Sequence, residues 1–118
     1  MGKLKIAIPT KAYAGLEDTV SEVFGKAKTF TIVDIENGQV RKVRVIDNPA
    51  ASYDYGAGPV AAKTLADLRV DFVMATELGL GASGLLRHHG IRNISVKPDT
   101  RVVDVIKESF GRAESKNR

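Results

Sequence analysis

The residues best suited to chemistry lie in a glycine-rich loop that contains neither histidine nor cysteine. The loop runs from Asn48 to Pro59 and reads Asn-Pro-Ala-Ala-Ser-Tyr-Asp-Tyr-Gly-Ala-Gly-Pro. An apolar segment with helical spacing follows it, so the loop would end at a helix N-terminus, where free N–H groups and the helix dipole favour an anion. A flexible connection without a ligand explains the glycines about as well. The predicted ligand-binding residues of this loop are Tyr53, Asp54, Tyr55, Gly56 and Gly58.

A second glycine-rich stretch, Gly79 to Gly84, follows the apolar segment Phe72–Ala75 and matches the glycine spacing of dinucleotide-binding loops. Three residues separate it from that segment, however, and the chain is too short for the two-half dinucleotide fold. We therefore interpret it as a second helix N-terminus close to the first loop, and we add Gly79 to the predicted site. Lys11, which follows the first apolar segment, would supply positive charge.

Residue patterns of known catalytic chemistry are missing from the sequence. The first apolar segment, Leu4 to Pro9, has no carboxylate with which a two-metal nuclease could hold its ions. No nucleophile elbow and no phosphate loop of the Gly-x-x-x-x-Gly-Lys type occurs either. His88 and His89 are adjacent, and neighbours on a helix point about 100° apart, which suits joint metal binding poorly. We expect a non-enzymatic protein without catalytic or metal-ligating residues, and we expect His89 to be half-buried in its helix.

Composition limits the remaining classes of protein. The 118 residues are 43% hydrophobic and 27% charged, which is typical of one soluble domain. The absence of cysteine excludes disulfides and thiolate ligands. No apolar run approaches the roughly 18 residues that a membrane span needs, so we expect a cytoplasmic protein without a membrane partner. The net charge of +4 comes from scattered residues, and we expect no nucleic-acid partner.

The elements that must position these loops form an α/β succession. Asn37-Gly38 lies between two apolar segments and predicts a tight hairpin, because Asn and Gly both tolerate positive φ. The order of the elements predicts a meander followed by βαβ units, in a domain of residues 1–110 with a mobile tail at 111–118. The expected elements are a strand at 4–9, a helical turn or two at 17–23, hairpin strands at 29–35 and 40–46, a helix from 59 to about 68, a strand at 72–75, a helix at 78–90, a strand at 91–96, and a helix capped by Asp99 or Thr100.

Four short motifs, in this order and spacing, resemble the dinitrogenase iron-molybdenum cofactor biosynthesis family. They are Phe24-Gly25-Lys26-Ala27, Asn48-Pro49, Gly56-Ala57-Gly58-Pro59, and the stretch from Leu85 to Ile91. The resemblance covers about residues 3 to 110. It implies a ribonuclease H-like three-layer α/β/α domain with a five-stranded mixed sheet, ordered 3-2-1-4-5, in which strand 2 is antiparallel. It also implies that the loops at 10–15, 48–58 and 76–81 share one sheet edge, where ligands of open α/β sheets bind.

The same resemblance implies a binding or carrier protein for iron-molybdenum cofactor or an iron-sulfur cluster, with a cluster donor or acceptor protein as partner. Two positions depart from the family pattern, which often has a histidine where this chain has Val23, and a His- or Gly-rich run at 50–55. Asp54 is the one ionised residue left in that run. Two alternatives therefore remain: a scaffold or interaction protein that has lost cluster binding, and a small enzyme that binds a phosphorylated metabolite.

Overall fold

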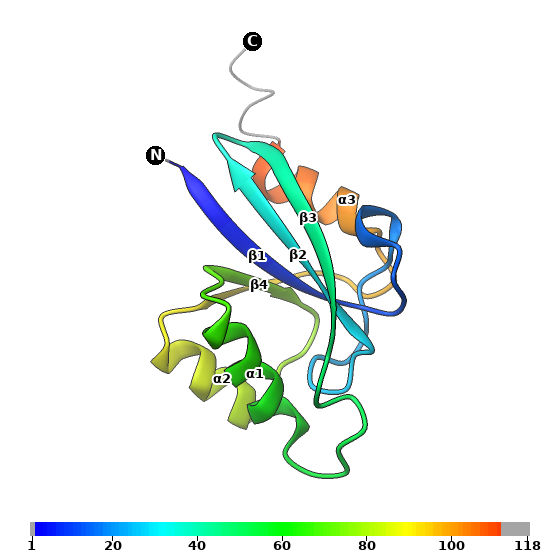
Figure 1. The fold of residues 1–118 in the computed structure, drawn as a ribbon, viewed down its shortest axis with the longest axis vertical. Helices are drawn as coiled ribbons and strands as arrows, with labels where there is room; N and C mark the ends of the chain where they lie inside the picture. The colour runs from blue at the N-terminus through cyan, green and yellow to red at the C-terminus, as the bar shows by residue number, and fades with distance from the viewer. Residues whose placement is uncertain (1, 112–118) are drawn as a thin grey trace.

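A computed structural model describes residues 2–111 as a five-stranded mixed sheet with helices on both faces (Figure 1). The strands are β1 (Lys3–Thr10), β2 (Thr29–Glu36), β3 (Gln39–Asp47), β4 (Phe72–Ala75) and β5 (Arg92–Ser95). The helices are α1 (Ala57–Asp67), α2 (Leu80–His88) and α3 (Val102–Ile106), with a 3-10 turn η1 (Gly15–Glu17) and a π turn η2 (Lys107–Gly111).

The sheet order is β3-β2-β1-β4-β5, with β2 antiparallel to both of its neighbours, so the predicted order and orientation are confirmed. The Asn-Gly hairpin is also confirmed, because Asn37 (φ 56°) and Gly38 (φ 82°) both adopt the left-handed conformation that joins β2 to β3.

The central strand β1 pairs unequally with its two neighbours. β1 pairs with β2 along its whole length but has only two register positions with β4, Ile6 opposite Phe72 and Ala7 opposite Val73.

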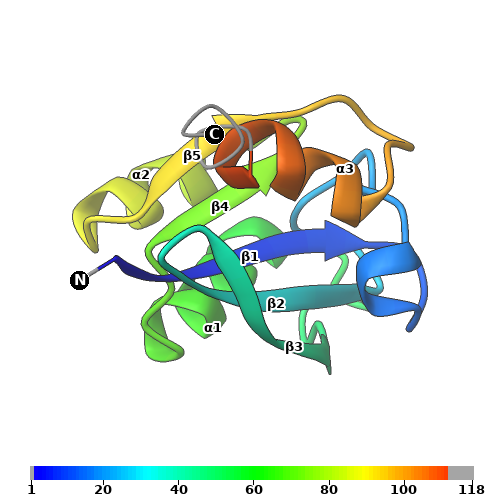
Figure 2. The same ribbon diagram turned by 90° about the horizontal axis from the view of Figure 1, so that it is seen from above.

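Alternating side chains of the strands build two cores, one on each face of the sheet. Ala7 and Ile32 face α1 and α2, whereas Ile6 and Val33 face α3. Figure 2 shows α3 on one side of β1 and β2 and α1 on the other. The period of two in the strands therefore accounts for the three-layer α/β/α arrangement that the family resemblance implied.

The predicted helical turns at residues 17–23 are wrong apart from η1. Thr19 and Val20 form β-bridges to Arg101 and Thr10, and we call residues 19–21 the bridge segment. The Val20 amide donates to the Thr100 carbonyl at 2.9 Å, and the Ser21 amide donates to the Pro9 carbonyl at 2.8 Å. The bridge segment thus lies between the end of β1 and the residues after β5. These long-range partners outweigh the local helical pattern.

Three further predictions need correction or lie outside the structure. Helix α3 has Arg101 at its N-cap without a side-chain cap, so neither Asp99 nor Thr100 caps it; the Asp99 amide and the Thr100 carbonyl both bond to the Val20 backbone. His89 is exposed, since α2 ends at His88. Of the predicted tail, Gly111 belongs to η2 and the rest lies outside the described residues. Among residues 2–111, no helix has the length and apolar character to cross a membrane.

Candidate functional site

A cleft of about 620 Å³ opens at the sheet edge where β1 and β4 end. Its walls come from three segments that are distant in the sequence: residues 22–26 after the bridge segment, the start of α1, and the link between β4 and α2. This is the edge at which the sequence predicted a ligand site. The lining residues are Glu22, Val23, Phe24, Gly25, Lys26, Ala57, Gly58, Glu77, Leu78 and Gly79.

Glycines allow the walls of the cleft to approach one another closely. A Cβ on Gly25 would lie 2.6 Å from the Gly58 nitrogen and 2.9 Å from its Cα, closer than real side chains come to backbone. A Cβ on Gly81 would lie 3.0 Å from the Pro59 ring. The first turns of α1 and α2 are therefore in contact, and the 22–26 segment packs directly on α1.

Asn48 fixes the 22–26 segment in place, although it does not line the cleft. Its side-chain amide donates to the Gly25 and Ala27 carbonyls, each at 2.8 Å, and its Oδ1 accepts the Ala50 N–H at 3.0 Å. Asn48 is 5% exposed, so water cannot replace these bonds without rearrangement. The Asn48-Pro49 motif therefore has a structural explanation.

Both helices that meet at the cleft begin without a side-chain cap. The N-cap residues are Gly56 (φ 73°) and Gly79, and neither can supply a side-chain acceptor to the first turn. The first intrahelical bonds at these ends are Val60 N–H to the Gly56 carbonyl and Ser83 N–H to the Gly79 carbonyl. The N–H groups of Ala57 and Gly58, which line the cleft, are left without an intrahelical acceptor. Two helix dipoles add a positive potential at this edge.

The charged side chains of the cleft are Glu22, Lys26 and Glu77. This donor set contains no imidazole and no thiolate, which are the usual ligands of metal clusters. Within residues 2–111, no group of three or more His, Cys, Asp or Glu side chains is arranged to hold a metal ion. The cleft therefore does not fit a cluster that the protein ligates directly, but backbone amides and Lys26 fit the anionic surface of one.

The structure brings some of the predicted site residues together and separates others. Gly58 and Gly79 line the cleft, and Gly56 adjoins it as the N-cap of α1. Tyr53, Asp54 and Tyr55 are exposed and do not line it, with Tyr55 90% exposed. The ligand-binding role of every one of these residues stays a prediction.

Lys11 does not line the cleft either. Its ammonium forms an ion pair with Asp99, and that hydrogen bond raises the lysine pKa above its ordinary value. Nearby, the Tyr13 hydroxyl donates to Asp47, which raises the tyrosine pKa above its ordinary value. These bonds connect the loop after β1 to Asp99, in the segment between β5 and α3, and to Asp47 at the end of β3.

Sequence reasoning missed the whole 22–26 wall of the cleft, together with Glu77. The signal that could have indicated this wall is the pair Phe24-Gly25. Phe24 is 3% exposed and packs against Phe30 with ring centroids 5.4 Å apart and ring planes tilted by 54°, so it anchors the segment in the α1/α2 core. The neighbouring Gly25 then faces the start of α1.

Comparison with known proteins gives a consistent result. The family model described as dinitrogenase iron-molybdenum cofactor matches residues 2–114. An uncharacterized protein of Methanocaldococcus jannaschii, MJ0580, is 30% identical over 88 residues, which are 75% of this chain and 70% of that protein. A NifB-like protein from Thermotoga, TM1290, has a TM-score of 0.72 at 28% identity, covering 92% of this chain and 88% of its own. The apo form of the orange protein of Desulfovibrio gigas shares the fold. Its TM-score is 0.82 at 24% identity, and the match covers 92% of this chain and 88% of that protein.

Proposed function

Because this chain belongs to the dinitrogenase iron-molybdenum cofactor family, we propose that it is a non-enzymatic carrier of an anionic metal cluster, bound in the cleft between the 22–26 segment and the first turns of α1 and α2. The observation that carries the proposal is the meeting of two uncapped helix N-termini at one cleft. The family's name supports iron-molybdenum cofactor, or an iron-sulfur cluster related to it, as the cargo.

The cargo would be held by hydrogen bonds and charge, without ligation to the metal. The Ala57 N–H group, at the uncapped start of α1, would donate to sulfide or carboxylate groups on the surface of a cluster, whereas Gly25 packs against the Gly58 nitrogen. Gly79 leaves room in the same cleft, because no atom lies within 4 Å of the place that a Cβ on this residue would take. This mode of binding is reversible, because no metal–protein bond has to break when the cargo leaves.

The cleft's own charges would keep the affinity moderate. Lys26 favours an anion, whereas Glu22 and Glu77 oppose it. All three residues are exposed, so solvent screens their charges, and each changes the binding free energy of the cargo by about 0.2–1 kcal/mol. A carrier needs such an affinity, because it must both accept and release its cargo.

A cluster donor or acceptor protein would dock on the same edge of the sheet. Large apolar side chains are exposed around the cleft: Val23 is 51% exposed, Leu80 is 94% exposed, and Tyr55 precedes the N-cap of α1. Exposed apolar and aromatic side chains that surround a ligand cleft are characteristic of a docking surface. We assign Tyr53 and Tyr55 to this contact and not to the cargo itself.

Anaerobic reconstitution tests the proposal. The purified protein is incubated with isolated iron-molybdenum cofactor, or with iron and sulfide, and desalted. We expect a visible absorption band to be retained. K26Q should lower the cofactor affinity two- to five-fold and E77Q should raise it by about the same factor, as expected for screened charges. K63Q, on the exposed surface of α1, is the matched control and should leave the affinity unchanged.

Retention of no colour from either source, together with no thermal shift with molybdate, would refute the carrier proposal and favour the scaffold alternative. Turnover of a phosphorylated metabolite that is abolished by a substitution in the cleft would instead refute the non-enzymatic part of the proposal.

A further inference from the structure

The strand β5 forms an open edge of the sheet, because within residues 2–111 it pairs with β4 alone (Figure 2). The Arg92 N–H points toward β4 and donates to the Asp71 carbonyl at 3.3 Å. Since the backbone groups of a strand alternate between its two sides, the N–H and C=O groups of Asn93 and Ser95 point away from β4. Three of the four residues of β5 are exposed. This edge therefore presents backbone donors and acceptors to which another strand could bind.

A groove of about 390 Å³ lies beside this edge, between α2 and the start of β5. Its apolar lining residues are Leu78, Leu86 and Ile91, of which the last two are buried. Successive side chains of a strand added to β5 would point alternately toward the α2 side of the sheet and toward the opposite side. One of them could therefore enter the groove, and the lining favours an apolar side chain there.

The formal charges of residues 87–98 are all positive. This segment contains Arg87, Arg92 and Lys97 and no Asp or Glu. None of the three cations has an ion-pair partner within residues 2–111. Strand β4 adds no charge, and Asp71, which precedes it, already accepts a hydrogen bond from the backbone of β1. Acidic side chains on an added strand would therefore meet uncompensated cations at this edge.

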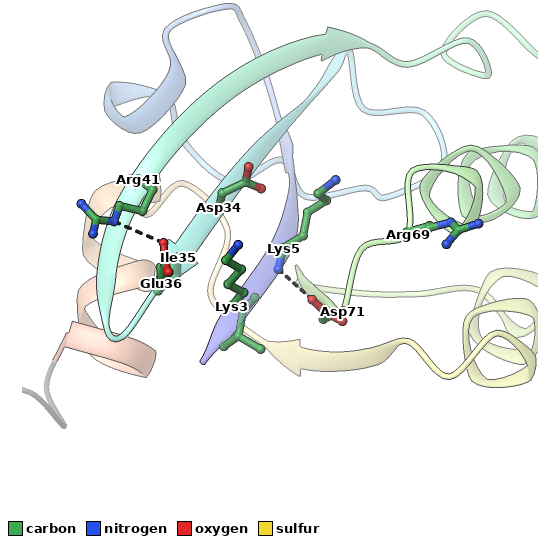
Figure 3. Close-up of a pocket in the computed structure, with 9 residues that line it drawn as sticks. Lys3, Lys5, Asp34, Ile35, Glu36, Arg41, Arg69 and Asp71 are labelled. Atoms are coloured by element: carbon green, nitrogen blue, oxygen red, sulfur yellow. Dashed lines mark hydrogen bonds and ion pairs between the residues drawn. The ribbon is translucent and has the colours of Figure 1, made fainter. Parts of the chain in front are cut away.

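The other edge strand, β3, differs because two of its three cations lie beside acids of β2. Arg41 pairs with Glu36 at 3.6 Å, and Figure 3 shows this ion pair. Lys42 lies opposite Asp34 in the register of the two strands. A second copy of this chain would bring cations of either edge against those of β5, which disfavours edge-to-edge pairing between copies. The edge at β5 therefore suits an acidic strand from another protein.

We propose that β5 binds an extended acidic segment of a partner protein, which adds to the sheet as a further strand and places one apolar side chain in the groove beside α2. The outward backbone groups of Asn93 and Ser95 pair with this strand, while Arg92 and Lys97 attract acidic residues at its two ends. A nucleic acid would match the charge but not the backbone pattern or the groove. The inference does not rest on the carrier proposal, because the uncapped helix N-termini take no part in it.

Amide chemical shifts of the ¹⁵N-labelled protein test this assignment with defined peptides. The probe is the acetylated and amidated heptapeptide Glu-Glu-Val-Leu-Val-Glu-Glu, together with forms that have isoleucine, valine, phenylalanine or alanine at the centre. We expect at least one apolar centre to shift the amides of residues 91–96 to saturation, while the amides of residues 25–26 and 57–58 stay in place. The alanine form should bind at least threefold more weakly, and a peptide with lysine in place of every glutamate should bind at least tenfold more weakly.

Methylation of the peptide's backbone nitrogens separates strand addition from attraction by charge. One peptide is methylated at one alternate set of nitrogens and a second peptide at the other set, so that composition and charge stay the same. In an added strand only one set faces β5, so one of the two peptides should lose binding and the other should keep it.

Variants of the protein complete the test. S95P removes an N–H that faces away from β4, and proline is tolerated on an edge strand, so the fold should persist while the peptide affinity falls at least tenfold. K97Q should weaken binding two- to five-fold, as expected for a screened charge, and the control K63Q on α1 should bind as the wild type does.

The proposal is overturned if no acidic peptide saturates these amides, if the lysine peptide binds equally well, or if S95P and both methylated peptides bind without loss. Saturation of the same amides by an oligothymidylate and by none of the peptides would assign the edge to nucleic acid and would overturn the proposal as well.

Discussion

Replacing Gly25 with alanine provides a direct test of how the cleft is built. Gly25 is not in the left-handed region, so alanine introduces no dihedral strain of its own. The added Cβ would instead lie 2.6 Å from the Gly58 nitrogen and 3.0 Å from the Ala57 carbonyl carbon, whereas ordinary contacts begin at 3.4 Å. All of these atoms are backbone, so no side chain can rotate away. The 22–26 segment or the start of α1 must move by about 0.8 Å.

The cost of this movement follows from the contacts that it disturbs. Overpacking a tight site costs about 1–3 kcal/mol, and displacing the segment also strains the hydrogen bonds from Asn48 to the Gly25 and Ala27 carbonyls. We therefore expect G25A to lower the free energy of unfolding by about 2–3 kcal/mol. In a domain of this size, that corresponds to a fall in Tm of roughly 8–12 °C.

Thermal unfolding followed by circular dichroism measures the effect, with G84A as the matched control. Gly84 lies inside α2 with no atom within 4 Å of a Cβ position, so alanine there should raise stability by about 0.5–1 kcal/mol through helix propensity. If G25A melted within about 1 °C of the wild type, the close approach of the two backbones could not be what holds the cleft together.

Further predictions concern the supports of the cleft, a strained turn and alkaline pH. N48A removes three hydrogen bonds of a buried side chain and leaves two backbone carbonyls without that donor, so urea unfolding should report a loss of about 2–4 kcal/mol. R69G should raise the free energy of unfolding by about 1 kcal/mol in the same assay, and R69A should not, because Arg69 has φ 61° and glycine alone relieves that conformation. The neutral Tyr13 phenol donates to Asp47, so its pKa is raised and its stabilising effect is present below about pH 10 and lost as pH rises through the raised pKa. Comparing the alkaline stability profiles of Y13F and the wild type checks this, and identical profiles would contradict it.

The elements that the sequence predicted correctly are those determined by neighbouring residues. The Asn37-Gly38 turn forces a hairpin wherever apolar strands flank it, and the apolar run of β4 has no polar side chain that could face water. The positions of the loops at one sheet edge followed from the strand order and directions that the family resemblance implied. The role of Tyr53 to Tyr55 was harder to predict, because periodicity does not determine whether an aromatic loop faces a cleft or solvent.

The wall of the cleft was missed because distant residues determine it. Val20 has a β-branched side chain and neighbours that tolerate a helical turn, yet its backbone bonds to Asp99 and Thr100, about eighty positions away. Lys11 was predicted to face a ligand, and it pairs with Asp99 from the same distant segment. A pattern read within ten or twenty residues has no information about such partners.

The bridge segment also has a consequence for the order in which the protein matures during synthesis. Residues 19–21 are held on one side by the end of β1, which precedes them in the chain, and on the other side by residues 99–101, which are synthesised about eighty positions later. The hairpin of β2 and β3 can form on the nascent chain long before then, because its contacts are local. The contacts of Asn48 and Phe24 hold the 22–26 wall itself, whereas the bridge segment that leads into it is completed only when residues 99–101 dock. A chain that lacks residues 99–101 would thus keep one support of the bridge segment, its contacts with the end of β1, and lose the other.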